Sequence, residues 1–452
     1  MLTFLLQALD ALYYGTLHLF MVLFGLIILL WLVRLFLSRK YVPWVEPFDV
    51  STAVVIPVVD EPIDLFDAVL ARIIGQKPDE IVVVINGPRN VALETACLKR
   101  GVKYLWTDIP GKRNAVAIGV NAVKSDVVLL VDSDTVWTDG TLSELKKPFA
   151  DPKVGGVTTR QHILQPTRSI WTRWAEWLET VRNAYSMPAM SVLGTVGCLP
   201  GRTIAFRRSI LVKNMHKFLT EKFLGVFLEV SDDRTLTNYA LKDGYKTVYQ
   251  STSLVYTDAP TKLRKLSKQQ YRWARGSQYN TLRMLPWMLR KAPVLALFYV
   301  GDIIVPFLIV GAFMSWFIRS MMETGTSNPY TPVLITLGIT PITIGILILG
   351  GVVLSVMFAA VRYSRAIETH PANFLWLPFY MFVNIVILVP IRIFGFARAA
   401  STDGWGTRAG GYGTDKRKQK RTFSSILTII PYILTIILLA GSILFGLKLY
   451  GN

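Results

Sequence analysis

Long apolar runs lie towards the two ends of this chain, and a mixed pattern of apolar and polar residues fills the middle. The first long run is Leu17–Leu37, followed at once by the cations Arg39 and Lys40. About 20 apolar residues in a helix cross the hydrocarbon core of a bilayer, so this run predicts a membrane-spanning helix. Because no small-residue cleavage site clearly follows it, we expect the helix to be retained and not cleaved as a signal peptide.

Short β-branched runs alternate with helical patterns between about Pro43 and Arg290. Three of these runs predict buried strands: Ala53–Val59, Ile81–Ile85 and Val127–Val131. Strands that alternate with helices are typical of a parallel sheet with crossover helices. A segment of about 245 residues is long enough to bury a proper core, so the sequence predicts an α/β globular domain here.

Beyond Pro293 the chain becomes apolar again and predicts further membrane helices. The candidates are Val294–Phe317, Val333–Ala360, Phe374–Phe394 and Ile426–Leu447. If each crossed once, the loop 397–422 would lie on the side opposite the globular domain. That loop contains the run KRKQKR, and basic loops favour the cytoplasmic side.

Two solutions to this conflict stay open. Pro378 and Pro390 interrupt the segment Phe374–Phe394, so we expect this segment to be re-entrant or to lie partly in the membrane interface. Alternatively, the segment Val333–Ala360, which contains Pro341 and a Gly-Gly pair, forms two short pieces.

The residues from Thr261 to Arg290 predict an amphipathic helix just before the apolar region. Apolar and aromatic positions alternate there with the cations Lys262, Arg264, Lys265, Lys268, Arg272 and Arg275. A basic amphipathic helix lies in the membrane interface, which explains most of these lysines without any catalytic role.

Composition supports a membrane protein. Of the 452 residues 52% are hydrophobic, and the formal net charge is +19. A protein with such a positive charge can bind nucleic acid, anionic surfaces or anionic substrates. In a membrane protein, basic cytoplasmic loops also account for a positive net charge. The two cysteines, Cys97 and Cys198, allow one bridge but no disulfide framework or cysteine-rich metal site.

The stretch LLVDSDT, residues 129–135, is an apolar strand that ends in Asp132 and Asp134. Alternate residues of a strand point the same way, so both carboxylates can converge on one cation. Mg²⁺ and Mn²⁺ bind carboxylate oxygens together with substrate phosphates, and open α/β sheets bind ligands at the carboxyl ends of strands. The alternative is a plain acidic turn.

Three further motifs carry candidate binding residues. IPGKRNA places Lys112 and Arg113 at the start of a predicted helix, where cations favour phosphate. VVIPVVDEP ends a strand with Asp60, and VINGP ends the next strand with Asn86. For all of them a solvated polar turn is the alternative.

A second acidic pair lies in VSDDRTLTN, residues 230–238. We expect Asp232 to be partly structural, capping a helix or pairing with Arg234. Asp233 is then the candidate general base, since a base needs an acceptor within reach of the attacking hydroxyl. The loop GCLPGRTIAFR, which contains Arg202, predicts a binding surface or a plain turn.

Two aromatic features complete the candidates. Trp171, Trp174 and Trp177 recur every three residues, which favours core or interface packing over a sugar-binding platform. The stretch DGWGTR, residues 403–408, combines mobile glycines with a tryptophan and predicts a mobile lid or a surface turn.

Taken in order, these motifs resemble the processive family 2 glycosyltransferases, which include cellulose, chitin and hyaluronan synthases. The specific motif is Gln269-x-x-Arg272-Trp273 followed by membrane helices, and WGTR at residues 405–408 is typical of the hyaluronan synthase branch. Stretches such as PGKRNA, VDSDTVWT, VGCLPGRTIAFR and GSQYN are similar to capsule synthases of that branch, which polymerise alternating glucose and glucuronic acid. The apolar segment Ile426–Leu447 is a departure from them.

The resemblance implies a Rossmann-like glycosyltransferase A-type α/β domain inserted between transmembrane helices. The implied divisions are 1–42, an N-terminal transmembrane helix; 43–260, a cytoplasmic catalytic domain; 261–292, the interface helix; 293–396, membrane helices; 397–423, a gating loop; and 424–452, a last transmembrane helix.

The resemblance also implies roles for single residues. Asp60 contacts the uracil, Asn86 and Asp132 bind the nucleotide, and Lys112 with Arg113 holds the diphosphate, aided by Gln269 and Arg272. Asp134 binds Mg²⁺ or Mn²⁺, and Asp233 beside Asp232 deprotonates the acceptor hydroxyl, which inverts the anomeric centre. Trp273 stacks on the acceptor sugar near Arg202, and Trp405, Gly406, Thr407 and Arg408 form the gating loop.

The implied protein is therefore a multi-pass plasma-membrane enzyme that binds UDP sugars, a growing polysaccharide and the lipid bilayer, and no nucleic acid. Glucose and glucuronic acid are the expected sugar pair. The alternatives are hyaluronan synthesis from N-acetylglucosamine and glucuronic acid, a single-sugar polymer, a non-processive transferase that modifies a lipid, and a transporter with a nucleotide-binding domain.

Overall fold

The computed structural model describes residues 16–109, 111–228, 230–324, 353, 356–369, 371–401 and 427–451. The chain divides into two compact units. The helical unit comprises residues 1–33, 297–397 and 431–452. The sheet unit comprises residues 34–296 and 398–430.

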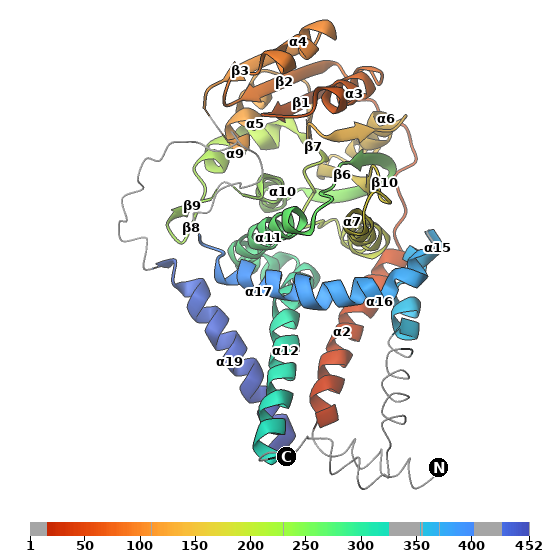
Figure 1. The fold of residues 1–452 in the computed structure, drawn as a ribbon. Helices are drawn as coiled ribbons and strands as arrows, with labels where there is room; N and C mark the ends of the chain where they lie inside the picture. Colours follow the sequence, from red (N-terminus) through yellow and green to blue (C-terminus); the bar gives the residue numbers. More distant parts are fainter. Residues whose placement is uncertain are drawn as a thin grey trace. The chain divides into compact units, whose positions relative to one another are not determined.

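An eight-stranded sheet forms the centre of the sheet unit, in the order β3-β2-β1-β4-β7-β6-β10-β5 (Figure 1). Strand β1 pairs in parallel with both β2 and β4, whereas β7 is antiparallel to β4 and β6. The strands are β1 Thr52–Val58, β2 Glu80–Asn86, β3 Lys103–Thr107, β4 Val127–Val131, β5 Thr135–Trp137, β6 Val154–Ile163, β7 Thr203–Arg207 and β10 Lys246–Thr257. The three predicted strands are β1, β2 and β4.

Helices cover the sheet because each crossover must bury its apolar face. They are α3 Ile63–Ile74, α4 Val91–Lys99, α5 Lys112–Asn121, α6 Thr141–Lys146, α7 Ile170–Val181, α8 Met187–Val192, α9 Arg208–Leu219, α10 Asp232–Lys242 and α11 Leu263–Lys291. A short hairpin, β8 Lys222–Phe223 with β9 Val226–Phe227, precedes α10. In α7, Trp174 and Trp177 are buried, as expected for core packing.

One glycine sets how closely α5 approaches the sheet. A Cβ at Gly119 would overlap the side chain of Val55 on β1, so only glycine permits this contact. The close approach fixes α5 against β1 and directs the first residue of α5, Lys112, towards the carboxyl end of β4. The site described below depends on this placement.

The helical unit contains three helices that are long and apolar enough to cross a membrane, by length and composition, among the described residues. They cover Pro293–Ser315, Asn373–Ala397 and Ile430–Lys448. Here α12 is Pro293–Thr324 and α19 is Ile430–Gly451. The two pack closely: a Cβ at Gly311 would overlap Ser442, and the Ser315 hydroxyl donates to the Ile443 carbonyl at 2.8 Å. Small residues at such contacts are typical of membrane helices.

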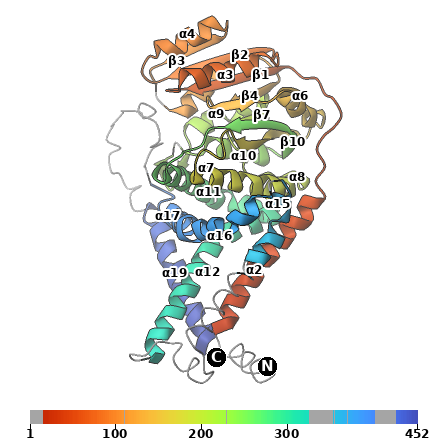
Figure 2. The same cartoon turned by 45° about the vertical axis from the view of Figure 1, so that its right-hand side comes forward.

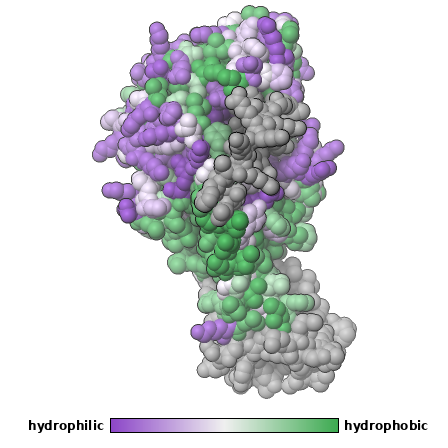
Figure 3. All heavy atoms as spheres, turned by 90° about the vertical axis from the view of Figure 1, so that its left-hand side faces the viewer, coloured by the Kyte–Doolittle hydropathy of each residue, from purple (hydrophilic) through white to green (hydrophobic). Residues whose placement is uncertain are grey.

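The side chains that these helices expose are largely apolar. On the face shown in Figure 3, hydrophobic side chains predominate over the described part of the helical unit, while many hydrophilic ones lie over the sheet unit. Phe313, Phe317, Ile436 and Leu444 are each more than half exposed. A surface of this kind is stable in contact with lipid tails, so it supports a membrane location.

The segment with two prolines has a distinct course. It consists of α16 Asn373–Val383, a π-helical turn at Asn384–Leu388 and α17 Val389–Ala397. In both views it runs crosswise to α12 (Figures 1 and 2). A π turn interrupts the regular helix here, next to Pro390, which lacks a backbone N–H. Most of the predicted segment Val333–Ala360, and the basic run in the loop 397–422, lie outside the described residues.

Candidate active site

Residues from four parts of the sheet unit line one small cavity at the carboxyl end of β4. Lys112 comes from α5, Asp132 follows β4, Gly201 precedes β7, and Asp232 with Asp233 begins α10. Gly201 lies between the charged groups: a Cβ built on it would be 3.7 Å from both Lys112 Nζ and Asp233 Oδ2. The cavity therefore brings a cation and a carboxylate close to the same glycine.

Lys112 forms an ion pair with Asp132. Burial alone would lower the pKa of Lys112, but Asp132, Asp232 and Asp233 together raise it above its ordinary value. The ammonium group therefore stays charged at neutral pH. A charged lysine at the start of a helix suits a phosphate group, which would compete with Asp132 for it.

Asp233 has a fixed orientation at the second residue of α10. Its Oδ2 accepts a hydrogen bond from the Gly201 backbone N–H at 3.1 Å, and its Oδ1 accepts from the Arg234 N–H at 2.8 Å. The Cys198 thiol is 3.9 Å from Oδ2, and burial raises the pKa of that thiol, which stays protonated. The carboxylate is only partly buried, so it remains accessible to a substrate hydroxyl.

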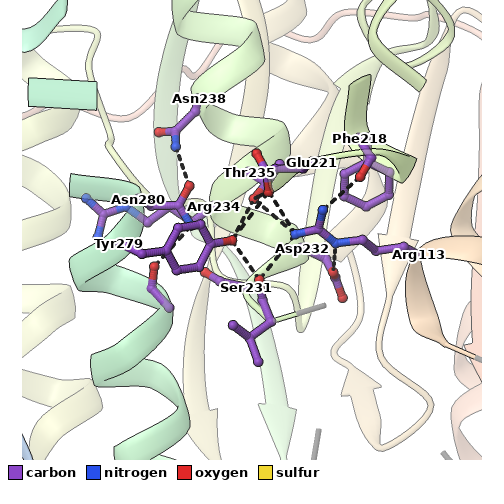
Figure 4. Close-up of polar contacts among 12 residues, drawn as sticks. Arg113, Phe218, Glu221, Ser231, Asp232, Arg234, Thr235, Asn238, Tyr279 and Asn280 are labelled. Atoms are coloured by element: carbon purple, nitrogen blue, oxygen red, sulfur yellow. Dashed lines mark hydrogen bonds and ion pairs between the residues drawn. The ribbon is translucent and has the colours of Figure 1, made fainter. Parts of the chain in front are cut away.

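Arg113 does not face this cavity, although it is the neighbour of Lys112. Its guanidinium is buried and donates to Asp232 and Glu221, both at 2.9 Å, and to the Phe218 carbonyl at 2.7 Å (Figure 4). With its donors occupied by the protein, Arg113 has a structural role. We therefore correct the expectation that it contacts the diphosphate.

Asp232 is the structural member of the acidic pair, and it pairs with Arg113 instead of Arg234. Burial raises its pKa, and the cations Arg113 and Lys112 oppose that effect. Arg234 instead donates to Thr281 at 2.8 Å and to the Ser277 carbonyl at 2.7 Å, which attaches α10 to α11. The predicted pair Asp232–Arg234 is wrong because the two side chains leave α10 on different sides.

Glu221 is the residue that the sequence analysis missed in this region. It is 4% exposed and accepts hydrogen bonds from Arg113 and, at 2.9 Å, from Thr235, and it also pairs with Arg283. Tyr279 of α11 lies against the same carboxylate at 3.4 Å (Figure 4). No motif in the sequence indicates this residue, because its partners lie far away along the chain.

Asn86 and Asp60 follow β2 and β1. In the amide orientation that satisfies both polar atoms, Asn86 donates to the Val58 carbonyl at 3.1 Å and accepts from the Gly111 N–H at 3.3 Å. Asn86 is 1% exposed, so it holds β1 to the loop before α5, and we correct the expectation that it contacts the nucleotide. Asp60 is exposed at the end of β1, where a ligand can reach it.

Asp134 lies in the turn between β4 and β5 and is partly buried. The turn is closed by the Thr135 N–H, which donates to the Asp132 carbonyl at 3.1 Å. Within the described residues, no three His, Cys, Asp or Glu side chains are grouped closely enough to hold a metal ion. A cation at this position would thus need oxygen ligands from a substrate.

The motif on α11 presents its tryptophan to solvent. Trp273 is 39% exposed, while Gln269 and Arg272 are partly buried. The Arg202 guanidinium lies over the Trp273 ring at 5.6 Å from its centroid, so the structure brings these two predicted acceptor residues together. The predicted gating loop, Trp405 to Arg408, lies outside the described residues.

Comparison with known proteins agrees with this architecture. A solved mannosyltransferase of Pyrobaculum calidifontis, in complex with GDP-Man and Mn²⁺, has a similar fold: the TM-score is 0.56, with 16% identity, over 84% of this chain and 96% of that one. A hyaluronan synthase of Streptococcus pyogenes is 28% identical over 85% of this chain and 90% of its own. An N-acetylglucosaminyltransferase of Rhizobium meliloti is 26% identical over 77% and 80%.

The family comparison is the most direct. The model described as glycosyltransferase like family 2 matches residues 50–276, which is 227 of the 452 residues and so half of the chain. This range includes Asp60, Lys112, the strand-end aspartates after β4, Asp233 and the Gln269–Trp273 motif. The protein therefore belongs to glycosyltransferase family 2, in the part of it that is similar to hyaluronan synthase.

Proposed function

We propose that this protein is a processive polysaccharide synthase that alternately transfers glucose and glucuronic acid from UDP sugars and exports the polymer through the plasma membrane. The observation that carries the proposal is the cavity in which Lys112, Asp132 and Asp233 meet. A cation that can bind phosphate and a carboxylate that can act as a base both lie close to Gly201 there, which supports the proposal. The relation to hyaluronan synthase along most of the chain supports polymer synthesis.

In this proposal Asp233 accepts the proton of the acceptor hydroxyl. The hydroxyl oxygen attacks the anomeric carbon of the donor sugar from the side opposite UDP, which breaks the bond to the diphosphate and inverts the centre. Lys112 stabilises the negative charge that develops on the departing UDP. Its ion pair with Asp132 holds the ammonium group in place before the donor arrives.

The remaining roles are the ones that the resemblance implies. Asp60 is exposed at the end of β1 and contacts the uracil. Gln269 and Arg272 support the diphosphate from α11, and Trp273 supplies the face on which the acceptor sugar stacks. Trp405 and Arg408, which lie outside the described residues, keep the gating role that the resemblance implies. The catalytic domain is cytoplasmic, where UDP sugars are made.

A divalent cation fits this donor set. Mg²⁺ and Mn²⁺ commonly use one or two carboxylates and complete their coordination with substrate phosphates, and Asp134 with Asp132 provides that number. When bound, the cation would neutralise charge on the diphosphate leaving group. The mannosyltransferase with the similar fold was solved with Mn²⁺, which supports a metal of this class.

Changing Asp134 to alanine should remove metal-dependent activity, because one of the two carboxylates for the cation is lost. We expect UDP release to fall to background at ordinary Mn²⁺ and to recover partly at high Mn²⁺. Titration of Mn²⁺ against the variant and against Asp139→Ala, an exposed aspartate on the same segment, measures this. A native enzyme that works equally well in excess chelator would remove the metal from the proposal.

The sugar pair rests on the stretches that are similar to the type 3 capsular polysaccharide synthase of pneumococcus, which uses UDP-glucose and UDP-glucuronic acid. The second candidate is hyaluronan synthesis, which the 28% identity to a hyaluronan synthase favours. The two differ only in the neutral sugar, glucose or N-acetylglucosamine. The chemistry at Asp233 and Lys112 is the same in both.

A donor-pair assay decides between them. The purified protein receives UDP-glucose, UDP-glucuronic acid and UDP-N-acetylglucosamine singly and in each pair, with Mn²⁺, and UDP release and product size are measured. We expect a high-mass product only with glucose plus glucuronic acid. Polymer only with N-acetylglucosamine plus glucuronic acid would establish the second candidate. A single sugar transferred to lipid would exclude a polymerase of either kind.

A further inference from the structure

A largely buried group of polar and charged side chains lies beside the candidate base, and the chemical step proposed above does not use it. It consists of Glu179 at the end of α7, Arg182 in the π-helical turn that follows, Arg202 before β7, and Gln161 on β6. We call it the arginine pair site. π-helical turns within longer helices are frequent at functional positions, and Arg182 is the first residue of this one.

Hydrogen bonds and ion pairs hold each member of the arginine pair site in place. Glu179 pairs with Arg202 at 2.6 Å and also with Arg182. The Gln161 side-chain oxygen accepts from both arginines at 3.1 Å, and its amide nitrogen donates to the Pro200 carbonyl at 3.1 Å. The two guanidiniums are thus positioned side by side around one carboxylate and one amide.

The charges in this site do not balance. Two guanidiniums share Glu179, and within the part of the chain that the structure describes no second carboxylate lies within ion-pair distance of either. Burial alone would raise the pKa of Glu179, but Arg182 and Arg202 hold it below its ordinary value, so the carboxylate is ionised. One positive charge remains, and side chains that are largely removed from water favour a compensating anion.

The backbone places this surplus charge beside the acceptor side of the active site. Arg202 directly follows Gly201, whose N–H holds Asp233, and its own carbonyl accepts from the Asp132 N–H at 3.0 Å. The Arg202 guanidinium also lies over Trp273, the exposed ring on α11. An anion that reached the arginine pair would therefore belong to a group that lies on Trp273 next to the base.

We propose that Arg182 and Arg202 bind the carboxylate of a glucuronate residue at the growing end of the polymer, while Trp273 stacks on its ring. This inference rests on the proposed function, since it needs an acceptor that ends in a uronic acid. The site serves one of the two alternating transfers, the addition of the neutral sugar to a glucuronate end. Transfer of glucuronic acid to a neutral end does not use it.

The test measures the two transfers separately. Enzyme carrying nascent polymer is incubated with one unlabelled donor until UDP release stops, so that every chain ends in that sugar. The donor is removed, the other donor is added with a radiolabel, and the rate of the first addition is measured. Arg202→Gln and Arg182→Gln are compared with Trp273→Ala and with Arg72→Gln, which breaks an exposed pair with Asp139.

For Arg202→Gln and Arg182→Gln, we expect the rate at which the neutral sugar is added to glucuronate ends to fall about 10- to 100-fold. This is the size of effect that the loss of one hydrogen bond to a charged group produces. Addition of glucuronic acid to neutral ends, and the KM for each donor, should stay close to those of the native protein. Glu179→Gln removes the competing carboxylate and should retain addition to glucuronate ends. Trp273→Ala should slow both transfers, and Arg72→Gln should slow neither of them.

Two results would count against the proposal in different ways. If both arginine variants slow the two transfers equally, while their melting temperatures match the native protein, the arginine pair does not recognise the carboxylate. If the native protein incorporates no glucuronic acid at all, the proposed sugar pair itself is wrong and the inference falls with it. The native control in the same assay separates these outcomes.

Discussion

Asp233→Asn is expected to abolish polymer synthesis while the protein still binds UDP. The asparagine side chain keeps the size of the aspartate and can still accept from the Gly201 N–H at the position that Oδ2 now occupies. It cannot take up the acceptor proton, and general bases contribute about 10²- to 10⁴-fold to rate. UDP release with both donors measures the turnover, and calorimetric titration with UDP measures the binding.

The neighbouring residue provides the matched control for this variant. Asp232→Asn leaves the base in place but weakens the pair with Arg113, so it should lower stability more than it lowers the rate of the remaining folded enzyme. If Asp233→Asn retained turnover near that of the native protein, Asp233 would not be the base. If it lost UDP binding as well, the carboxylate would act in donor binding instead.

Arg113→Met should produce the largest loss of stability. The change leaves Asp232 and Glu221 buried without the guanidinium that bridges them, and removing one partner of a buried ion pair costs about 3–5 kcal/mol. Thermal unfolding in detergent, followed by tryptophan fluorescence, should show a clearly lower midpoint. Activity should fall too, since Arg113 connects the start of α5 to the start of α10.

An exposed arginine shows how much of this effect comes from burial. In the pair Arg72–Asp139 the side chains are 55% and 96% exposed. Exposed pairs contribute about 0–1 kcal/mol, so Arg72→Met should leave the midpoint nearly unchanged. Equal unfolding midpoints for Arg113→Met and Arg72→Met would mean that the buried ion pairs of Arg113 do not stabilise the fold. Arg113→Lys, which keeps the charge but not the fork of donors, should fall between them.

The sequence by itself determined the elements and the class of protein. The β-branched runs that became β1, β2 and β4 are buried on both faces, so their composition is nearly enough to identify them. The aspartates after β4 could be predicted as site residues because ligands of open α/β sheets bind at the carboxyl ends of the strands. Apolar length alone identified α12 and α19.

Only the tertiary structure decided which member of each charged pair takes part in the site. Lys112 lines the cavity while Arg113 is buried against Glu221. Asp232 and Asp233 both line it, but Asp232 is held by its ion pair with Arg113, which leaves Asp233 as the candidate base. Successive residues of a helix point about 100° apart, so two neighbours of like charge reach different partners. Which of them turns inwards depends on how α5 and α10 pack on elements about 100 residues away along the chain, and local sequence does not record that packing.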